Sequence, residues 1–504
     1  MGDKAPVRFE RGGRVENLLV GFPAAAFNGF MNSKPFFVTR RSFLKKCSLA
    51  AAATGLPAWF LERSLAEAAP RPKRLGPNDR PAIALIGCGG MGRGDGANAM
   101  RFGDLVAVCD VDDTHAAAAA EQYGKKGRTP DKYNDFRKVL ERDDINIIVN
   151  ATPDHWHTLI NLAAANAGKD VYGEKPLSLT IDEGKHMVKA VRKSGIVFQT
   201  GTQQRSMDRF RLACELVRNG RIGRLQQITV WLPAGLREGP FSPSQPPQGL
   251  NWDFWLGQAP KVDYVTQRCH ALWRFWYDYS GGTVTDWGAH HNDIALWAVD
   301  LPGPVSVEGQ ALTQPIPGGY TAISDYVINY TYANGVLHTV RTTHDDSIYG
   351  EVKKENGQRN GIKFEGSAGW IWVNRAEIEA SDEALLSTPL PAGAQRLYVS
   401  KDHMGNFFDC VRSRKLPVAG VEAGHRSASL CHMGVIALRL GRKLQWDPAR
   451  EMFTGDCAKE AFWMKGATRL MRGLETFTGD GAKEANQWLA RKMRQPFDYS
   501  FAGA

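Results

Sequence analysis

Between residues 81 and 200, short apolar runs alternate with helical patterns. The strand-like runs are residues 81–86, 105–109, 146–150, 170–172 and 196–199. Residues 116–123 and 157–167, which lie between these runs, have the apolar spacing of helices. Alternating strands and helices predict a parallel, doubly wound sheet. The sequence therefore indicates an α/β Rossmann domain over residues 81–200.

A different pattern begins near residue 201. Strand-like runs at residues 226–232, 305–311, 324–332, 335–343 and 370–372 mostly alternate apolar with polar side chains. Such alternation is typical of an antiparallel sheet with one covered face. We therefore expect an α+β domain with a large, mostly antiparallel open sheet over residues 201–446. Residues 235–249 contain four prolines and predict a long loop beside a substrate cleft.

A glycine loop follows the first predicted strand. Residues Gly87, Gly89, Gly90, Met91 and Gly92 give the pattern G-x-G-x-x-G. Its glycines allow a tight turn, close approach of the backbone to a pyrophosphate, and tight packing of helix on strand. Asp110 ends the next apolar run, 23 residues after Gly87, where an acid is expected to bind a ribose hydroxyl. This pattern predicts NAD binding rather than NADP; the alternative is a turn with a capping Asp.

The positive charge is concentrated at the N-terminus. The 504 residues carry 63 Lys and Arg against 53 Asp and Glu, and residues 1–68 hold ten of the former against five of the latter. Half of the excess thus lies in this segment, and the remainder shows no basic stripe that would indicate a nucleic-acid partner. Eight cysteines are too few for a disulfide framework.

Residues 39–45, Thr-Arg-Arg-Ser-Phe-Leu-Lys, resemble a twin-arginine (Tat) export signal. An apolar stretch at residues 47–61 and the small-x-small site at residues 66–68 follow in the expected order. The stretch is too short to span a bilayer comfortably. We expect a signal over residues 31–68, with Met31 as the true start, although an amphipathic helix is the alternative. The Tat machinery would then be a partner, the protein would be periplasmic or otherwise exported, and no membrane span would remain after processing.

Glu174-Lys175-Pro176, together with Thr152-Pro153 and the glycine loop, resembles the Gfo/Idh/MocA family. The resemblance covers residues 81–446 and implies that Lys175 reaches the reacting oxygen, with Pro176 following a cis peptide bond. It also places Thr152, Pro153, His157 and Glu174 beside the cofactor. The alternative for Lys175 is a surface lysine paired with Glu174.

A second motif of the same resemblance contains Asp286 and His290, which are four residues apart and would share one helix face. The resemblance implies that Asp286 orients His290 and that His290 takes the proton of a substrate hydroxyl. A histidine suits this role because its pKa lies near neutrality. The alternative is that Asp286 caps a helix and His290 is an ordinary core histidine.

Weaker candidates for substrate contact are Gln203, Arg205, Trp287 and His291. Aromatic residues are dense between residues 252 and 287, which suits either a carbohydrate cleft or ordinary core packing. Asp154, His155, His157, His290, His291 and His403 invite a metal interpretation, but they lack zinc-ligand spacing, so we expect no metal.

The chain ends with a duplication, because residues 453–461 recur at residues 477–485, a spacing of 24. Two copies do not make a solenoid, and we expect one added helix within a C-terminal arm. The predicted organisation is a leader at 1–68, a linker at 69–80, domains at 81–200 and 201–446, and an arm at 447–504.

The sequence as a whole predicts an exported, NAD-dependent oxidoreductase acting on a sugar, polyol or glycoside hydroxyl, and the family resemblance implies a homo-oligomer. Because an exported enzyme has no free pool of NAD, we expect the cofactor to stay bound and be recycled. A redox-neutral glycoside hydrolase working through a transient keto-sugar, and a non-catalytic sugar-binding relative, remain as alternatives.

Overall fold

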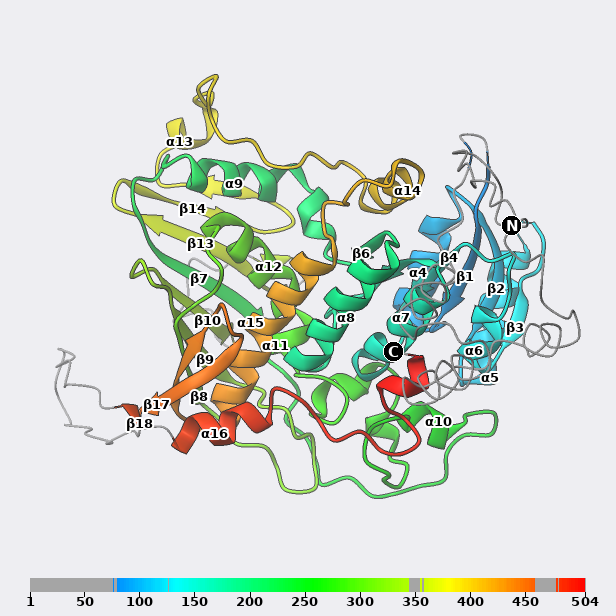
Figure 1. Cartoon of the computed structure of the whole chain (residues 1–504). Helices are drawn as coiled ribbons and strands as arrows, with labels where there is room; N and C mark the ends of the chain where they lie inside the picture. Colours follow the sequence, from blue (N-terminus) through cyan, green and yellow to red (C-terminus); the bar gives the residue numbers. More distant parts are fainter. Residues whose placement is uncertain are drawn as a thin grey trace, which may run out of the picture.

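The computed structural model describes residues 76, 79–125, 127–343, 354–355, 358–457, 477–478 and 480–503. The predicted export signal lies outside these residues and stays a prediction. Two sheets lie at opposite sides of the described chain, with a layer of helices between them (Figure 1).

The N-terminal sheet is parallel throughout its described strands, in the order β3-β2-β1-β4-β5-β6. This order is that of a dinucleotide-binding Rossmann fold, as predicted. The strands are β1 (Ala82–Ile86), β2 (Asp104–Cys109), β3 (Asp131–Tyr133), β4 (Ile147–Asn150), β5 (Asp170–Gly173) and β6 (Phe198–Thr200). The strand β3 escaped prediction because it is a short, polar edge strand whose burial is slight.

Helices connect these strands and cover the sheet: α4 (Gly90–Ala99), α5 (Asp113–Gly124), α6 (Phe136–Leu140), α7 (Asp154–Asn166) and α8 (Ile181–Ser194). Side-chain caps fix where several of them begin. Asp112 caps α5 by accepting from Thr114 N–H, and Thr180 caps α8 by accepting from Glu183 N–H. These caps satisfy donors that a helix leaves unpaired at its start.

The second sheet has ten described strands in the order β15-β14-β13-β7-β10-β9-β8-β16-β17-β18. Only β7 and β10 pair in parallel among them, so the sheet is mostly antiparallel as predicted. Its strands are β7 (Leu225–Pro233), β8 (Ser306–Ala311), β9 (Tyr326–Thr331), β10 (Leu337–Thr343), β13 (Gly361–Gly366), β14 (Gly369–Val373), β15 (Ile378–Ala380), β16 (Lys443–Asp447), β17 (Met452–Cys457) and β18 (Phe477–Thr478). A separate hairpin joins β11 (Lys354–Glu355) to β12 (Gln358–Arg359).

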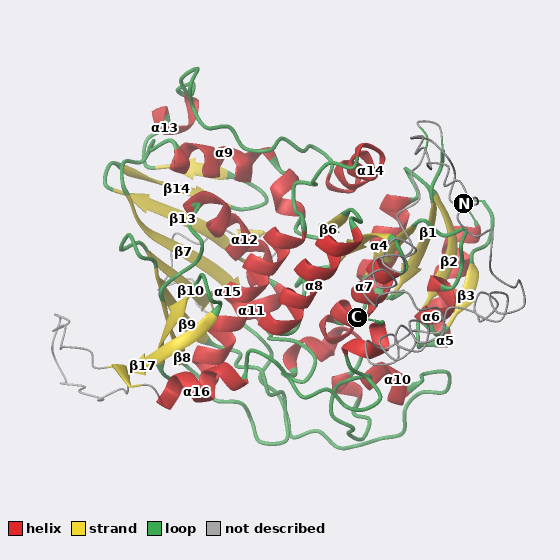
Figure 2. Ribbon diagram, viewed as in Figure 1, coloured by secondary structure: helices red, strands yellow, loops and turns green. Residues whose placement is uncertain are grey.

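Helices lie along the face of this sheet that is turned toward the Rossmann domain (Figure 2). The α-helices of this part are α9 (Asp208–Arg218), α10 (Trp252–Leu256), α11 (Thr283–Asp286), α12 (Gly288–Val299), α13 (Ala384–Ser387), α14 (His403–Ser413), α15 (Val421–Leu440) and α16 (Asp480–Gln487). Short 3-10 turns are η2 (Gln203–Ser206), η3 (Thr266–Arg268), η4 (His270–Phe275) and η5 (Tyr499–Ala502).

Helix α15 belongs to both halves of the molecule. Near its start, Val421 and Ala428 join the hydrophobic core beside α8 in the Rossmann domain. Further along, Leu430, Met433 and Ile436 join the core of the large sheet. Helix α14 also returns to the Rossmann domain, where Phe407 and Phe408 pack against the other face of its sheet.

The last described residues pack against the Rossmann domain as well. Phe497 and Phe501 join the core around α7, and the Arg491 guanidinium donates to Glu183 at 2.8 Å. The first copy of the duplication begins in β17, whereas the second copy begins in β18 and continues into α16. Residues 458–476, which lie between β17 and β18, are outside the described residues.

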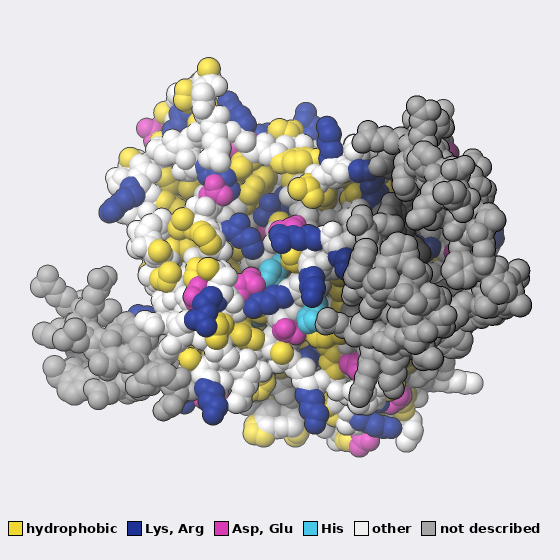
Figure 3. Space-filling model, viewed as in Figure 1, with side chains coloured by type: hydrophobic (Ala, Val, Ile, Leu, Met, Phe, Trp, Pro, Cys, Tyr) yellow, Lys and Arg dark blue, Asp and Glu magenta, His cyan; other side chains and the backbone are white. Residues whose placement is uncertain are grey.

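Within the described residues, none of the helices has the length and apolar character needed to cross a membrane. On the face shown in Figure 3, Lys and Arg side chains are interspersed with acidic and apolar ones rather than forming one continuous basic surface.

Candidate active site

One cavity of about 410 Å³ contains the glycine loop and the predicted catalytic lysine together. It follows the carboxyl-terminal ends of β1, β2, β4 and β5, where α/β folds of this type bind ligands. The second domain closes it with α10, η4 and α11. Its lining includes Gly87, Gly89, Gly90, Met91, Gly92, Asp110, His115, Thr152, Pro153, Asp154, His157, Glu174, Lys175, Phe254, Trp255, His270, Trp273, Arg274 and Asp286.

The glycine loop has the shape that a pyrophosphate requires. Gly87 has φ of 88°, and a Cβ there would lie 2.6 Å from the Ala151 backbone. A Cβ on Gly92 would collide with the Gly87 carbonyl. By contrast, a Cβ on Gly89 or Gly90 meets no atom within 4 Å, so this side of the loop is open. Helix α4 starts at Gly90 without a side-chain cap, which leaves its N–H groups available to an anion.

Asp110 is held in place at the end of β2. Its carboxylate accepts from Cys88 N–H at 2.7 Å and from Asp112 N–H at 3.0 Å. The glycine loop, through Cys88, and the chain just after β2, through Asp112, therefore fix the acid where a ribose diol would bind. This arrangement and the open glycine loop fit NAD, as the sequence predicted.

Other predicted cofactor-shell residues also line the cavity, and His157 connects two of their loops. Its ring nitrogens lie 2.7 Å from the Pro176 carbonyl oxygen and 2.8 Å from that of Thr152. Burial lowers the pKa of His157 to about 4, although both backbone contacts oppose this shift. The Lys175–Pro176 bond is cis, as the family resemblance implied.

Lys175 and Asp286 form an ion pair across the two domains. Lys175 Nζ donates to the Asp286 carboxylate at 2.6 Å and to its backbone carbonyl at 2.9 Å. The Lys175 side chain is 9% exposed, so it is not the surface lysine of the alternative interpretation. Arg274 donates to the same carboxylate oxygen at 3.2 Å. Burial would raise the pKa of Asp286, but Lys175 and Arg274 outweigh it and bring the pKa to about 2.

The structure differs from the expectation that Asp286 orients His290. Trp287 separates α11 from α12, and the carboxylate is engaged by Lys175 and Arg274 instead. Among the described residues, no hydrogen bond joins Asp286 to His290, and His290 Nδ1 has no partner. Burial, and next the charge of Lys175, hold the pKa of His290 well below its usual value. His290 is therefore a buried, neutral imidazole, and unlike Lys175 and Asp286 it is not part of the cavity lining.

The four weaker substrate candidates are not part of the cavity lining. Arg205 donates to Asp293 at 2.6 and 2.8 Å, and His291 lies 2.8 Å from the Asn360 side-chain oxygen. Gln203 donates to Glu174 at 3.1 Å. Trp287 lies under the guanidinium of Arg375, 5.0 Å from its ring centre. Their polar groups or ring faces are thus engaged by other side chains, which the sequence could not reveal.

Two acidic groups of the site were missed. Asp154 is buried, accepts from Ser280 Oγ at 2.6 Å, and has its pKa raised to about 7 by burial. Asp95 lies against Glu174; burial first, then the charge of Glu174, raise its pKa. Of these two residues only Glu174 lines the cavity. Asp95 belongs to no recognisable motif, and Asp154, which follows Thr152-Pro153, was considered only as a metal ligand.

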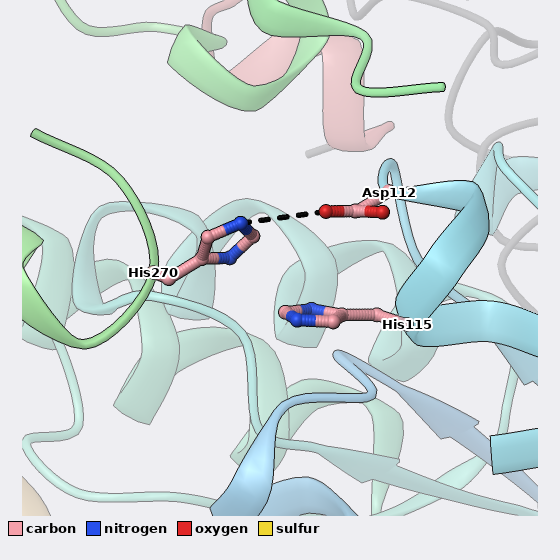
Figure 4. A group of neighbouring side chains, drawn as sticks. All are labelled: Asp112, His115 and His270. Atoms are coloured by element: carbon pink, nitrogen blue, oxygen red, sulfur yellow. Dashed lines mark ion pairs between the residues drawn. The ribbon is translucent and has the colours of Figure 1, made fainter. Parts of the chain in front are cut away.

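The histidines considered as metal ligands from the sequence do not converge in the described part of the chain. The residues that do gather are Asp112, His115 and His270, whose ligand atoms all lie within 4.8 Å of one another (Figure 4). No motif in the sequence predicted this group.

The parallel sheet, the glycine loop and the acid at β2 define a dinucleotide-binding enzyme fold. Residues 82–202 match the sequence model of the oxidoreductase family with an NAD-binding Rossmann fold, and residues 234–471 match that of its C-terminal alpha/beta domain. Together these matches cover more than two thirds of the sequence. The chain belongs to the Gfo/Idh/MocA oxidoreductase family, and it is an NAD-dependent oxidoreductase.

This chain is also similar to individual proteins of the family. Levoglucosan dehydrogenase of Pseudarthrobacter phenanthrenivorans is 28% identical over 289 residues, which are 55% of this chain and 68% of that protein. Glycosyl hydrolase family 109 protein 2 of a Shewanella species is 34% identical over 160 residues, 29% of this chain and 35% of that one. A solved levoglucosan dehydrogenase, in complex with NADH and levoglucosan, has a TM-score of 0.55 and 20% identity, covering 73% of this chain and 99% of that one. The solved structure supports the fold.

Proposed function

We propose that the protein is an exported oxidoreductase that oxidises a secondary hydroxyl of a sugar, polyol or glycoside while its NAD stays bound. The observation that carries this proposal is the Lys175–Asp286 pair inside the cavity that contains the glycine loop. A fixed cation next to a nicotinamide site is what oxidation of an alcohol to a ketone requires.

The glycine loop and Asp110 would hold NAD, which would supply the hydride acceptor for the carbinol carbon. Lys175 would bind the substrate oxygen, because its ammonium stabilises the negative charge that develops there. Asp286 keeps that ammonium at its position, since the ion pair is 2.6 Å long and mostly buried. His290 is a buried, neutral imidazole outside the cavity lining, so its part as the base that takes the hydroxyl proton rests on the family resemblance.

The rest of the cavity suits a carbohydrate. Phe254, Trp255 and Trp273 supply aromatic side chains to the lining, and the apolar faces of a sugar ring pack well on aromatic rings. Arg274 lies over the Trp273 ring at 4.4 Å and adds a guanidinium that can donate to hydroxyl groups. Trp276 and Tyr279 belong to the same buried aromatic cluster as Trp255 and Trp273, but they do not line the cavity.

Export is proposed from the sequence of residues 31–68. A Tat-type route, as the signal resemblance implies, carries folded proteins, so NAD would be loaded before export and recycled in the site. Recycling needs either a second sugar as hydride acceptor or a redox-neutral reaction.

The redox-neutral reaction is our second candidate, favoured by the likeness to a family 109 glycosyl hydrolase. Oxidation of a ring hydroxyl would acidify the neighbouring C–H, after which the aglycone is eliminated, water is added and the hydride returns. Lys175 would hold the same oxygen in this sequence of steps. Both candidates need the same first oxidation and differ in the products.

The test uses the full chain purified after export. We expect released NAD upon denaturation and activity on a panel of sugars, polyols and nitrophenyl glycosides. Net NADH or a reduced co-substrate identifies the dehydrogenase, whereas free sugar without net redox change identifies the hydrolase. Lys175→Met should lower the rate about 10²- to 10³-fold, the usual effect of removing a donor to a developing oxyanion.

The matched control is Lys189→Met, which changes an exposed lysine on α8. A Lys175→Met enzyme as active as this control would refute the catalytic assignment. A chain that keeps NAD and binds sugars without turnover would instead be the non-catalytic relative.

A further inference from the structure

The strands and loops around Asp110 bring three metal-ligand side chains together. Asp112 and His115 come from the start of α5, and His270 comes from the start of η4 in the second domain (Figure 4). His115 and His270 line the same cavity as the glycine loop, and the ring of His115 lies 3.7 Å from the Asp110 carboxylate. The group therefore lies at the end of the cavity that holds the ribose-binding acid.

Backbone contacts hold these loops in position. Asp113 N–H donates to the Gly249 carbonyl at 3.0 Å, and Asn251 N–H donates to the Val111 carbonyl at 3.0 Å. One oxygen of Asp112 accepts from Thr114 N–H at 2.8 Å, which leaves its other oxygen facing His270. His270 has φ of 49°, a left-handed conformation that non-glycine residues adopt with strain. Such strain is found where a side chain must be aimed at a ligand.

The spacing of the donors fits a shared ion better than direct pairing. His270 Nε2 lies 3.4 Å from the Asp112 carboxylate, beyond the range of about 2.7–3.2 Å for an N–H···O hydrogen bond. Two ligands at about 2.0–2.2 Å from a tetrahedral ion stand roughly 3.4 Å apart. The rings of His115 and His270 are 4.5 Å apart, and the ligand atoms of all three side chains lie within 4.8 Å of one another.

We propose that Asp112, His115 and His270 bind one divalent transition-metal ion of the Zn²⁺ class. Two imidazoles and a carboxylate are ligands that such ions favour, and three protein ligands leave a position for water. The ion joins the second domain to the Rossmann domain beside Asp110. Because this link closes the ribose end of the cavity, it slows the release of NAD. This role of the ion rests on NAD binding in the cavity, and it does not require that the substrate be a sugar.

The test starts from full-length protein stripped of metal with a chelator and titrated with Zn²⁺ in a calorimeter. We expect one ion per chain, and loss of this stoichiometric binding in His115→Gln and His270→Gln. His186→Gln is the matched control, because His186 lies on α8 outside the cluster. Equal binding by the control and both cluster variants, or no saturable binding by the parent, overturns the proposal.

Two further measurements do not depend on the variants folding. X-ray absorption at the zinc edge of the parent protein should show nitrogen and oxygen ligands with two imidazoles; a sulfur ligand or fewer imidazoles overturns the assignment. Loading with Zn²⁺ should slow NAD dissociation roughly 5- to 150-fold, the usual range for coupling between two sites. An unchanged rate with one ion bound would retain the metal site but refute its role in holding the cofactor.

Discussion

Substitution of Asp286 by Asn tests the ion pair at the centre of the site. The change keeps the size of the side chain but removes the charge that faces Lys175 and Arg274. The pKa of Asp286 falls from its usual 3.8 to about 2 in the folded protein, because the two cations outweigh burial. Each pKa unit corresponds to about 1.4 kcal/mol, so the ionised carboxylate stabilises the fold by about 2 kcal/mol.

The pH dependence of this contribution has a definite sign. A group whose pKa is depressed by folding adds stability above its unfolded pKa and loses it as the pH falls through the folded value. The difference between the parent and Asp286→Asn should thus be constant from pH 8 to about pH 5. It should shrink below pH 4 as the parent carboxylate becomes protonated toward its pKa of about 2.

Urea denaturation followed by fluorescence, at several pH values, measures this difference. The control is Asp278→Asn, because Asp278 forms a more exposed pair with Arg268 at 3.3 Å and should contribute no more than about 1 kcal/mol. A loss for Asp286→Asn equal to that of the control, or one that grows as the pH falls, would refute the electrostatic reasoning.

Three other outcomes are expected. Gly92→Ala places a Cβ against the Gly87 carbonyl and should cost about 1–3 kcal/mol of overpacking, so NAD affinity measured by fluorescence falls roughly 5- to 150-fold. Gly94→Ala, with open space around its Cβ, should leave the affinity unchanged. Arg205→Met breaks a buried pair with Asp293 and should lower unfolding free energy by about 3–5 kcal/mol. The exposed Arg192→Met should lower it by no more than about 1 kcal/mol, and equal losses would contradict our structural role for Arg205. Peptide mapping of the native precursor and exported protein should find no peptide from residues 1–30 and a mature start near residue 69; any such peptide would refute Met31 as the start.

The NAD-binding domain was predictable because the residues expected to bind the cofactor follow the strands closely in the sequence. The glycine loop follows an apolar strand, and Asp110 and Lys175 each lie directly after another strand. Parallel strands end at one edge of a sheet, so these residues had to meet. The strands β7 to β10 were visible as apolar or alternating runs, and β9 buries every second residue.

The remaining features depend on contacts between distant segments. Arg205 is a free cation in the sequence, and only the fold places Asp293 against it. His270 lies 155 residues after His115, and no spacing rule connects the two. Helix α15 has apolar residues on all sides because both halves cover it, so it shows no amphipathic stripe.

The position of α15 limits how this enzyme can be divided or recombined. A cut between the Rossmann half and the sheet half leaves the helix with one half and exposes an apolar groove on the other. A chimera that exchanges the substrate-binding half must therefore match α15 to a Rossmann surface on one side and a sheet on the other. Homologous swaps that preserve the packing of Val421 and Ala428 are the ones we expect to yield well-folded hybrids.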